Sequence, residues 1–215
     1  MQYILILISL FVFQKTLSAQ ECQSPCNTIL PPLNFQPQCP SWWSKGWAVT
    51  VYGGPITSQD SSKIFLQGKA KFEGSAILAV AASKRLVSFL DNRLDLEFET
   101  QGVKHFGGQT HFEINPVVLI ARWKAFPWNA TLPTTIAIGD GLSIATNTPK
   151  LELATRGAKY TSRILNYLMT EITLSLPCSH WALVARYHHR SGAFGTFNGV
   201  HDASTAFAAG LKYWF

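Results

Sequence analysis

The sequence predicts an all-β protein, an eight-stranded antiparallel up-and-down transmembrane β-barrel, and three observations lead to this fold class. Residues 204–215 alternate, with apolar side chains such as Phe207 and Leu211 on one face and small or polar ones on the other, as in a strand that separates lipid from a barrel lumen. Charged residues make up only 14% of the chain while aromatic residues reach 13%, which is a low charge content for a soluble domain. After residue 19, no stretch approaches about 18 consecutive apolar residues, so the lipid-facing surface is expected on strands.

The first residues have the composition of a secretion signal. Residues 1–19 are mostly apolar and end in small side chains, which indicates a signal peptide cleaved after Ala19. Because Lys15 is the only early cation, an uncleaved anchor is the alternative, although the apolar run is short for a spanning helix. We expect residues 20–45 to form an N-terminal periplasmic arm and residues 46–215 to form a barrel in the bacterial cell outer membrane.

Alternating runs separated by turn-forming residues mark the strands in chain order. The expected strands are residues 46–54, 75–86, 94–106, 111–124, 134–147, 165–176, 180–191 and 204–215. The third is the clearest, because Leu96 and Phe98 face one way and Asp95 faces the other. Pro116 interrupts the fourth strand and predicts a bulge, since proline cannot donate to a strand ladder. In the fifth, strict alternation would place Asp140 among apolar side chains, so we expect a kink that turns this carboxylate inward.

An even number of strands puts both termini of the barrel chain in the periplasm. The segments expected on the outer side are then residues 55–74, 107–110, 148–164 and 192–203. Under this topology every tryptophan maps to the periplasmic rim, where amphipathic indoles are favoured. These tryptophans are Trp42, Trp43, Trp47, Trp123, Trp128, Trp181 and Trp214.

Four cysteines, Cys22, Cys26, Cys39 and Cys178, are compatible with an oxidising compartment. Four cysteines allow three pairings, and the sequence alone does not choose among them. We expect Cys22 to pair with Cys26 and Cys39 with Cys178, which would staple the N-terminal arm to a periplasmic turn. A metal site is a weaker alternative, because no histidine lies near the first two cysteines.

Charged residues on the inward face of several strands predict a polar interior. A small barrel fills its interior with side chains, so these groups are expected to form a charged network without a wide pore. They are Asp95, Glu97, Glu99, Glu113, Arg122, Glu171, Arg186, His188 and Lys212.

The outer end of the seventh strand carries the residue types of an ester hydrolase. His189 and Ser191 share the outward face with Trp181 and Leu183. From Trp181 to Ser191 the strand rises about 23 Å along the membrane normal at a tilt near 45°, close to the apolar band of about 25 Å. A serine and a histidine side by side at that level have the spacing of a nucleophile and its general base. The alternative is a polar pair at a strand end, with no chemistry.

The secretion signal, the eight strands, the His189-Arg190-Ser191 element and the aromatic-terminated last strand resemble the PagL family of lipid A deacylases. The resemblance implies an eight-stranded outer-membrane barrel that hydrolyses an acyl ester of lipid A without a cofactor or a metal. It implies Ser191 as nucleophile and His189 as base. The family's acidic residue is a glutamate, and no glutamate follows Ser191 in this chain. Asp202 is the nearest acidic substitute.

The same resemblance supplies the expected substrate contacts. Backbone N–H groups near Gly192 are expected to stabilise the oxyanion. Asn198 is an alternative group to orient the imidazole, and Arg190 is expected beside the substrate.

Two function classes remain after these observations. The first is an outer-membrane lipid A deacylase, a carboxylic ester hydrolase acting at the outer leaflet. The second is a non-catalytic structural or interaction barrel, which the missing glutamate favours. The expected partners are lipid A of lipopolysaccharide and outer-membrane lipid, with no nucleic acid, and the net charge of +6 favours an anionic surface. Transport is the least favoured role, because eight strands enclose too little space.

Overall fold

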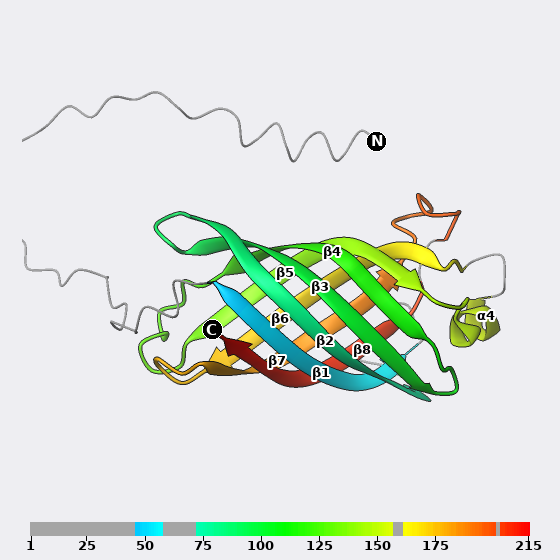
Figure 1. Ribbon diagram of the computed structural model, residues 1–215, viewed down its shortest axis with the longest axis horizontal. Helices are drawn as coiled ribbons and strands as arrows, with labels where there is room; N and C mark the ends of the chain where they lie inside the picture. Colours follow the sequence, from blue (N-terminus) through cyan, green and yellow to red (C-terminus); the bar gives the residue numbers. More distant parts are fainter. Residues whose placement is uncertain (1–45, 58–71, 157–160, 201–202) are drawn as a thin grey trace, which may run out of the picture. The chain divides into compact units, whose positions relative to one another are not determined.

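In the computed structural model, the described part of the chain comprises residues 46–57, 72–156, 161–200 and 203–215. Each strand pairs antiparallel with the next, and β8 pairs with β1 to close the barrel (Figure 1). The predicted fold class is confirmed, and each of the eight strands overlaps an expected one. Their bounds are β1 Trp47–Thr57, β2 Phe72–Phe89, β3 Leu94–Gly107, β4 Phe112–Trp123, β5 Thr134–Ala145, β6 Ile164–Ser175, β7 Trp181–Ser191 and β8 Thr205–Trp214, with the short helix α4, Lys150–Arg156, between β5 and β6.

The barrel wall is apolar on the outside and polar on the inside. Large apolar side chains with much of their surface exposed alternate along the strands with buried ones, as in β7, where exposed Leu183 lies between buried Ala182 and Val184. Further exposed examples come from every other strand: Val51, Leu78, Phe106, Leu119, Ile136, Ile172 and Leu211. A continuous apolar exterior of this kind is stable against lipid and costly against water. The protein is therefore an outer-membrane β-barrel. Among the described residues, no helix has the length and apolar composition needed to cross a membrane.

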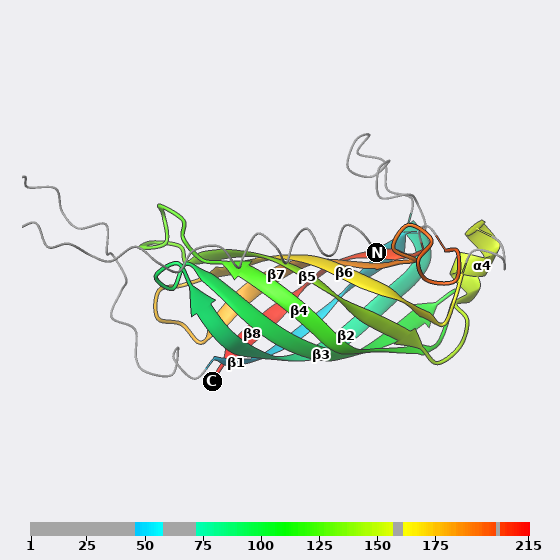
Figure 2. The ribbon, with the colours of Figure 1, turned by 90° about the horizontal axis from the view of Figure 1, so that it is seen from above.

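Aromatic residues mark one end of this wall. Trp47, Trp123, Trp128, Trp181 and Trp214 lie at the ends of β1, β4, β7 and β8 or in the β4–β5 turn. In an up-and-down barrel these positions share one end, the end at which the chain terminates (Figures 1 and 2). Such an aromatic girdle is typical of a membrane–water interface. In outer-membrane barrels with an even number of strands, the first strand begins and the last strand ends at the periplasmic side, so the opposite end, which carries α4 and the β7–β8 loop, is the outer end.

The bulge predicted at Pro116 is present, because the register of β4 against β5 shifts between Ile114 and Val118. Close backbone approach accompanies it, since a Cβ at Gly141 would lie 2.2 Å from the carbonyl oxygen of Val117. The inward kink predicted at Asp140 is wrong. The β5–β6 ladder runs without interruption from Thr134 to Ile144, so alternation is kept and Asp140 stays on the exposed outer face. The irregularity is taken up by β4 instead.

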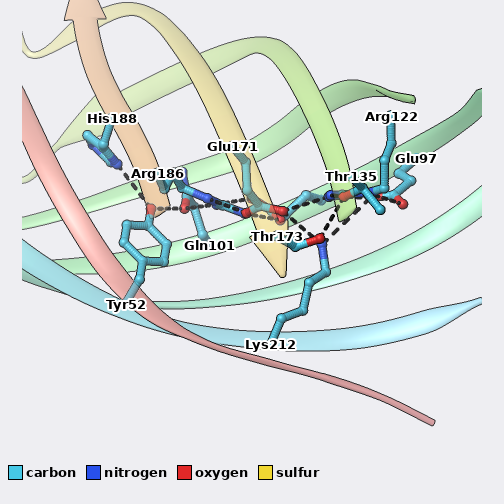
Figure 3. Close-up of polar contacts among 11 residues, drawn as sticks. Tyr52, Glu97, Gln101, Arg122, Thr135, Glu171, Thr173, Arg186, His188 and Lys212 are labelled. Carbon is cyan, nitrogen blue, oxygen red and sulfur yellow. Dashed lines mark hydrogen bonds and ion pairs between the residues drawn. The ribbon is translucent and has the colours of Figure 1, made fainter. Parts of the chain in front are cut away.

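Side chains fill the barrel interior with a balanced network of charges (Figure 3). Arg186 donates to both oxygens of Glu99 at 2.7 and 3.0 Å and to Glu171 at 2.8 Å. Glu171 also accepts from Arg122 at 2.8 Å and from Lys212 at 3.2 Å. Arg122 in turn pairs with Glu97 at 2.8 Å, so three buried cations meet three buried carboxylates. This confirms the predicted charged interior.

A second cluster ties the outer end of the barrel to α4. Arg190 Nη1 donates to Glu152 Oε1 of α4 at 2.6 Å, and its Nε donates to Ser143 Oγ at 2.8 Å. Ser143 donates to Glu113, whose other oxygen lies 2.9 Å from His105 Nε2. Glu152, Arg190 and Glu113 are all buried. The helix is therefore anchored by ion pairs that reach into the lumen.

Several predictions fall on other parts of the chain. The signal peptide, the arm, Cys22, Cys26, Cys39 and Asp202 lie outside the described residues. Cys178, in the β6–β7 turn, is disulfide-bonded. The pairing with Cys39 stays a prediction.

Candidate active site

Strand β7 sends two sets of side chains to opposite sides of the wall. Arg186 and Arg190 reach acidic partners inside the barrel, so they define the inward face. His189 and Ser191 have the other parity and lie on the outer face with Leu183. Because β7 ends at Ser191, both residues lie at the outer end of the barrel.

The His189 ring is held in place by its neighbours. Its Nδ1 lies 2.9 Å from Oγ1 of Thr205, the residue directly across the β7–β8 ladder. The ring stacks on Tyr187 with centroids 5.6 Å apart, and Tyr187 meets Phe207 edge-on at 5.5 Å. Only 6% of His189 is exposed. The imidazole therefore lies on the lipid side of the wall but is buried by neighbouring side chains, and the Thr205 hydroxyl fixes its orientation.

Ser191 is half-buried, and its Oγ accepts a hydrogen bond from the N–H of Ala193 at 3.3 Å. Among the described residues, no hydrogen bond joins Ser191 to His189. One residue lies between Ser191 and His189 in the sequence, so their Cα atoms are about 7 Å apart along the strand. Catalytic hydrogen bonds are often long before a substrate binds, so this spacing is compatible with proton transfer in a complex.

The loop after Ser191 has an unusual backbone. Ala193, Phe194 and Asn198 have φ angles of 47°, 58° and 51°, in the left-handed region that non-glycine residues rarely occupy. Gly192 packs against Val200 so closely that a Cβ would lie 1.7 Å from the Val200 carbonyl oxygen. Strained backbone of this kind concentrates at functional sites.

The remaining predicted site residues are placed differently from the nucleophile and base. Arg190 is fully buried inside the barrel and bound to Glu152, so its guanidinium is not available to a substrate at the outer face. The reason is its parity, which is opposite to that of its two neighbours in sequence. Asn198 donates to Ser162 Oγ at 2.7 Å, in the segment before β6, rather than to the imidazole.

Three further outward-facing residues, which the sequence analysis does not predict as site residues, lie in this region. Thr205 of β8 faces His189, and Asn166 of β6 faces Ser191 across the ladder. Asn166 Nδ2 donates to Asp140 Oδ1 of β5 at 2.8 Å. We call Thr205, His189, Ser191, Asn166 and Asp140 the outer polar row. These five residues lie together because of the pairing register between strands, which the sequence alone does not give. The outward direction of Asp140, by contrast, follows from simple alternation along β5.

The row combines a nucleophile, an imidazole and hydrogen-bonding groups on four neighbouring strands. A serine hydroxyl beside an oriented imidazole can carry out acyl transfer. In the part of the chain that the structure describes, no group of three or more histidine, cysteine, aspartate or glutamate side chains is arranged to hold a metal ion.

Comparison with known proteins gives structural neighbours only. No family profile and no curated protein sequence matches this chain. The crystal structure of the outer membrane enzyme PagL superposes with a TM-score of 0.49 at 13% identity, covering 78% of this chain and 99% of that one. The crystal structure of Neisserial surface protein A (NspA) gives a TM-score of 0.46 at 16% identity, covering 79% and 97%. One neighbour is named an enzyme and the other a surface protein. At this level of similarity neither assigns a function to the chain.

Proposed function

We propose that this barrel is a lipid A deacylase that hydrolyses an acyl ester of lipopolysaccharide at the outer leaflet. The observation that carries the proposal is a serine and an oriented imidazole side by side on the lipid face at the outer end of β7. Polar side chains on a mostly apolar, lipid-facing wall are costly to maintain, which favours a functional role. Lipid A is the ester-bearing lipid expected at this level of the outer membrane.

The reaction proposed for this pair is a two-step acyl transfer. His189 accepts the Ser191 proton on Nε2 while Oγ attacks the ester carbonyl carbon, and the resulting imidazolium then protonates the departing alcohol. Water, activated by the same imidazole, releases the fatty acid from the acylated serine. For Nε2 to be free as the base, the neutral ring carries its proton on Nδ1, and the hydrogen bond that Nδ1–H donates to Thr205 Oγ1 keeps the ring oriented through both steps.

The loop that follows Ser191 supplies candidate oxyanion donors. The N–H of Ala193 lies 3.3 Å from Ser191 Oγ, so one backbone donor of this turn lies beside the nucleophile, next to where the oxyanion would form. Removing one such donor in other hydrolases costs about 2.7–4 kcal/mol of transition-state stabilisation. The tight packing of Gly192 on Val200 holds this turn in place.

The alternative is a structural or interaction barrel without chemistry. Two observations favour it: His189 is almost completely covered, and Ser191 makes no hydrogen bond to it among the described residues. A triad also needs a third group, and Thr205 offers a hydroxyl where hydrolases commonly use a carboxylate.

Mass spectrometry of lipid A from cells that express the chain separates the two proposals. The hydrolase predicts loss of one hydroxyacyl chain with the native sequence and intact lipid A with Ser191→Ala or His189→Ala. Ser179→Ala, at the inner end of the barrel, is the matched control and should behave as native. Folding is checked by the heat-dependent electrophoretic mobility of the barrel. Intact lipid A in cells that contain folded native protein would refute the hydrolase and leave the alternative.

A further inference from the structure

Asp140 carries a carboxylate on the lipid face of β5. It lies between Ile138 and Leu142 on the outer face, and its side chain is exposed. Asp140 precedes the outer end of β5 at Ala145 by five residues, which places it about 12 Å deeper along the membrane normal at a tilt near 45°. That depth corresponds to acyl chains rather than to sugar headgroups. An ionisable side chain at this depth is expensive and is by default a candidate functional group.

One neighbour holds this carboxylate in a defined position. Asn166 Nδ2 donates to Asp140 Oδ1 at 2.8 Å, while Oδ2 of Asp140 has no hydrogen-bond or ion-pair partner among the described residues. Asn166 lies directly across the β6–β7 ladder from Ser191, and Leu142 lies directly across from Asn166 on β5. Asp140 is therefore two strands across and two residues along from the candidate nucleophile, about 12 Å at ordinary strand spacing and rise.

The chemistry of the pair restricts what it can bind. A carboxylate only accepts hydrogen bonds, so its ligand must present a donor, and an anionic phosphate would be repelled. At the depth of the acyl chains, an uncharged donor is supplied by a hydroxyl group on a chain. Both groups lie on paired strands rather than on loops, so the subsite is preformed.

We propose that Asp140 and Asn166 form a subsite that accepts the hydroxyl of a hydroxylated acyl chain and so determines which lipids are bound beside Ser191. This inference rests on the proposed function for the role of Ser191 and adds a preference for hydroxylated over plain chains. Asp140 and Asn166 act as positioning residues, since neither contacts the ester that is cleaved.

Binding to a barrel that cannot turn over tests the subsite without depending on hydrolysis. Folded Ser191→Ala protein in detergent is mixed with equal amounts of two glucosamine glycolipids, one with 3-hydroxyacyl chains and one with unhydroxylated chains of equal length. Native mass spectrometry then measures the bound fraction of each. We expect about a tenfold preference for the hydroxylated lipid, which is the ratio in bound fraction that the weaker hydrogen bonds to charged groups produce. Adding Asp140→Asn should reduce it below about twofold.

The control is Asp91→Asn in the same background, which removes one carboxylate from the exposed β2–β3 turn and should keep the full preference. An Asp140→Asn variant that keeps the preference, or a Ser191→Ala protein that shows none, overturns the subsite. Hydrolysis of both lipids at native rates by Asp140→Asn alone would also overturn the subsite while leaving the hydrolase intact. Preferential binding by a native barrel that never hydrolyses either lipid would overturn the hydrolase and leave the subsite standing.

Discussion

Replacing Glu171 with glutamine should destabilise the barrel more than any conservative change at its surface. Glu171 accepts hydrogen bonds from Arg122, Arg186 and Lys212 in the middle of the interior network (Figure 3). Glutamine has nearly the same shape, so packing is kept while the negative charge is lost. The perturbation is therefore electrostatic.

The magnitude follows from the charge count of the network. In the native barrel three cations face Glu97, Glu99 and Glu171, and all six groups are buried. Without Glu171, three cations remain for two carboxylates. Breaking a buried ion pair from one side costs about 3–5 kcal/mol, because the partner charge stays buried without compensation. Adding Lys212→Met to Glu171→Gln restores the balance, and we expect it to recover much of the loss.

The assay is equilibrium unfolding by urea from lipid vesicles, followed by tryptophan fluorescence. Asp91→Asn, an exposed carboxylate removed from a turn, is the control and should change the free energy of unfolding by less than about 0.5 kcal/mol. A loss for Glu171→Gln no larger than that of the control would refute the view that paired charges hold the interior together. So would a double variant less stable than Glu171→Gln alone.

Two further predictions concern the outer end of the barrel. Thr205→Val removes the hydroxyl at His189 Nδ1 while keeping the shape, and it should lower the rate of ester hydrolysis about tenfold and shift its pH profile, with unfolding in urea unchanged. Burial, with the nearby His105 and Arg190, lowers the pKa of His111 from its ordinary 6.5 to about 4. Between pH 6.5 and about 4, His111 is protonated in the unfolded chain and neutral in the folded barrel. The contribution of His111 to the free energy of unfolding is therefore fully present above pH 6.5 and is lost as the pH falls toward 4. His111→Gln should flatten the pH dependence of urea unfolding in that range; an unchanged curve would contradict the assignment.

Strand alternation accounts for most of what the sequence predicted correctly. Side-chain direction follows from parity along one strand, so the inward charges Glu99, Arg186 and Lys212 could be assigned before any pairing was known. The bulge at Pro116 followed from a local property, the missing N–H. The kink predicted at Asp140 is wrong, because strand pairing keeps this carboxylate on the lipid face. Alternation held there, and a hydrogen bond from Asn166 is part of its compensation.

The candidate site was less predictable because it depends on register between strands. That Thr205 meets His189 and that Asn166 meets Ser191 follows from which residues face each other across two ladders. A shift by one residue would send those side chains to the other side of the wall. The prediction for Arg190 fails for a different reason. Its position between His189 and Ser191 suggests a substrate contact, but alternation along β7 puts its side chain inside the barrel with Glu152.

The most direct test of the account is whether Ser191 reacts from the lipid side. Membranes that contain the folded protein are treated with a fluorophosphonate on a long alkyl chain, which partitions into lipid and reacts with activated serines, and peptide mass spectrometry then locates the adduct. The account predicts a single adduct at Ser191 that disappears in His189→Ala. A folded native barrel with no adduct, or with an adduct that persists without the imidazole, would contradict it.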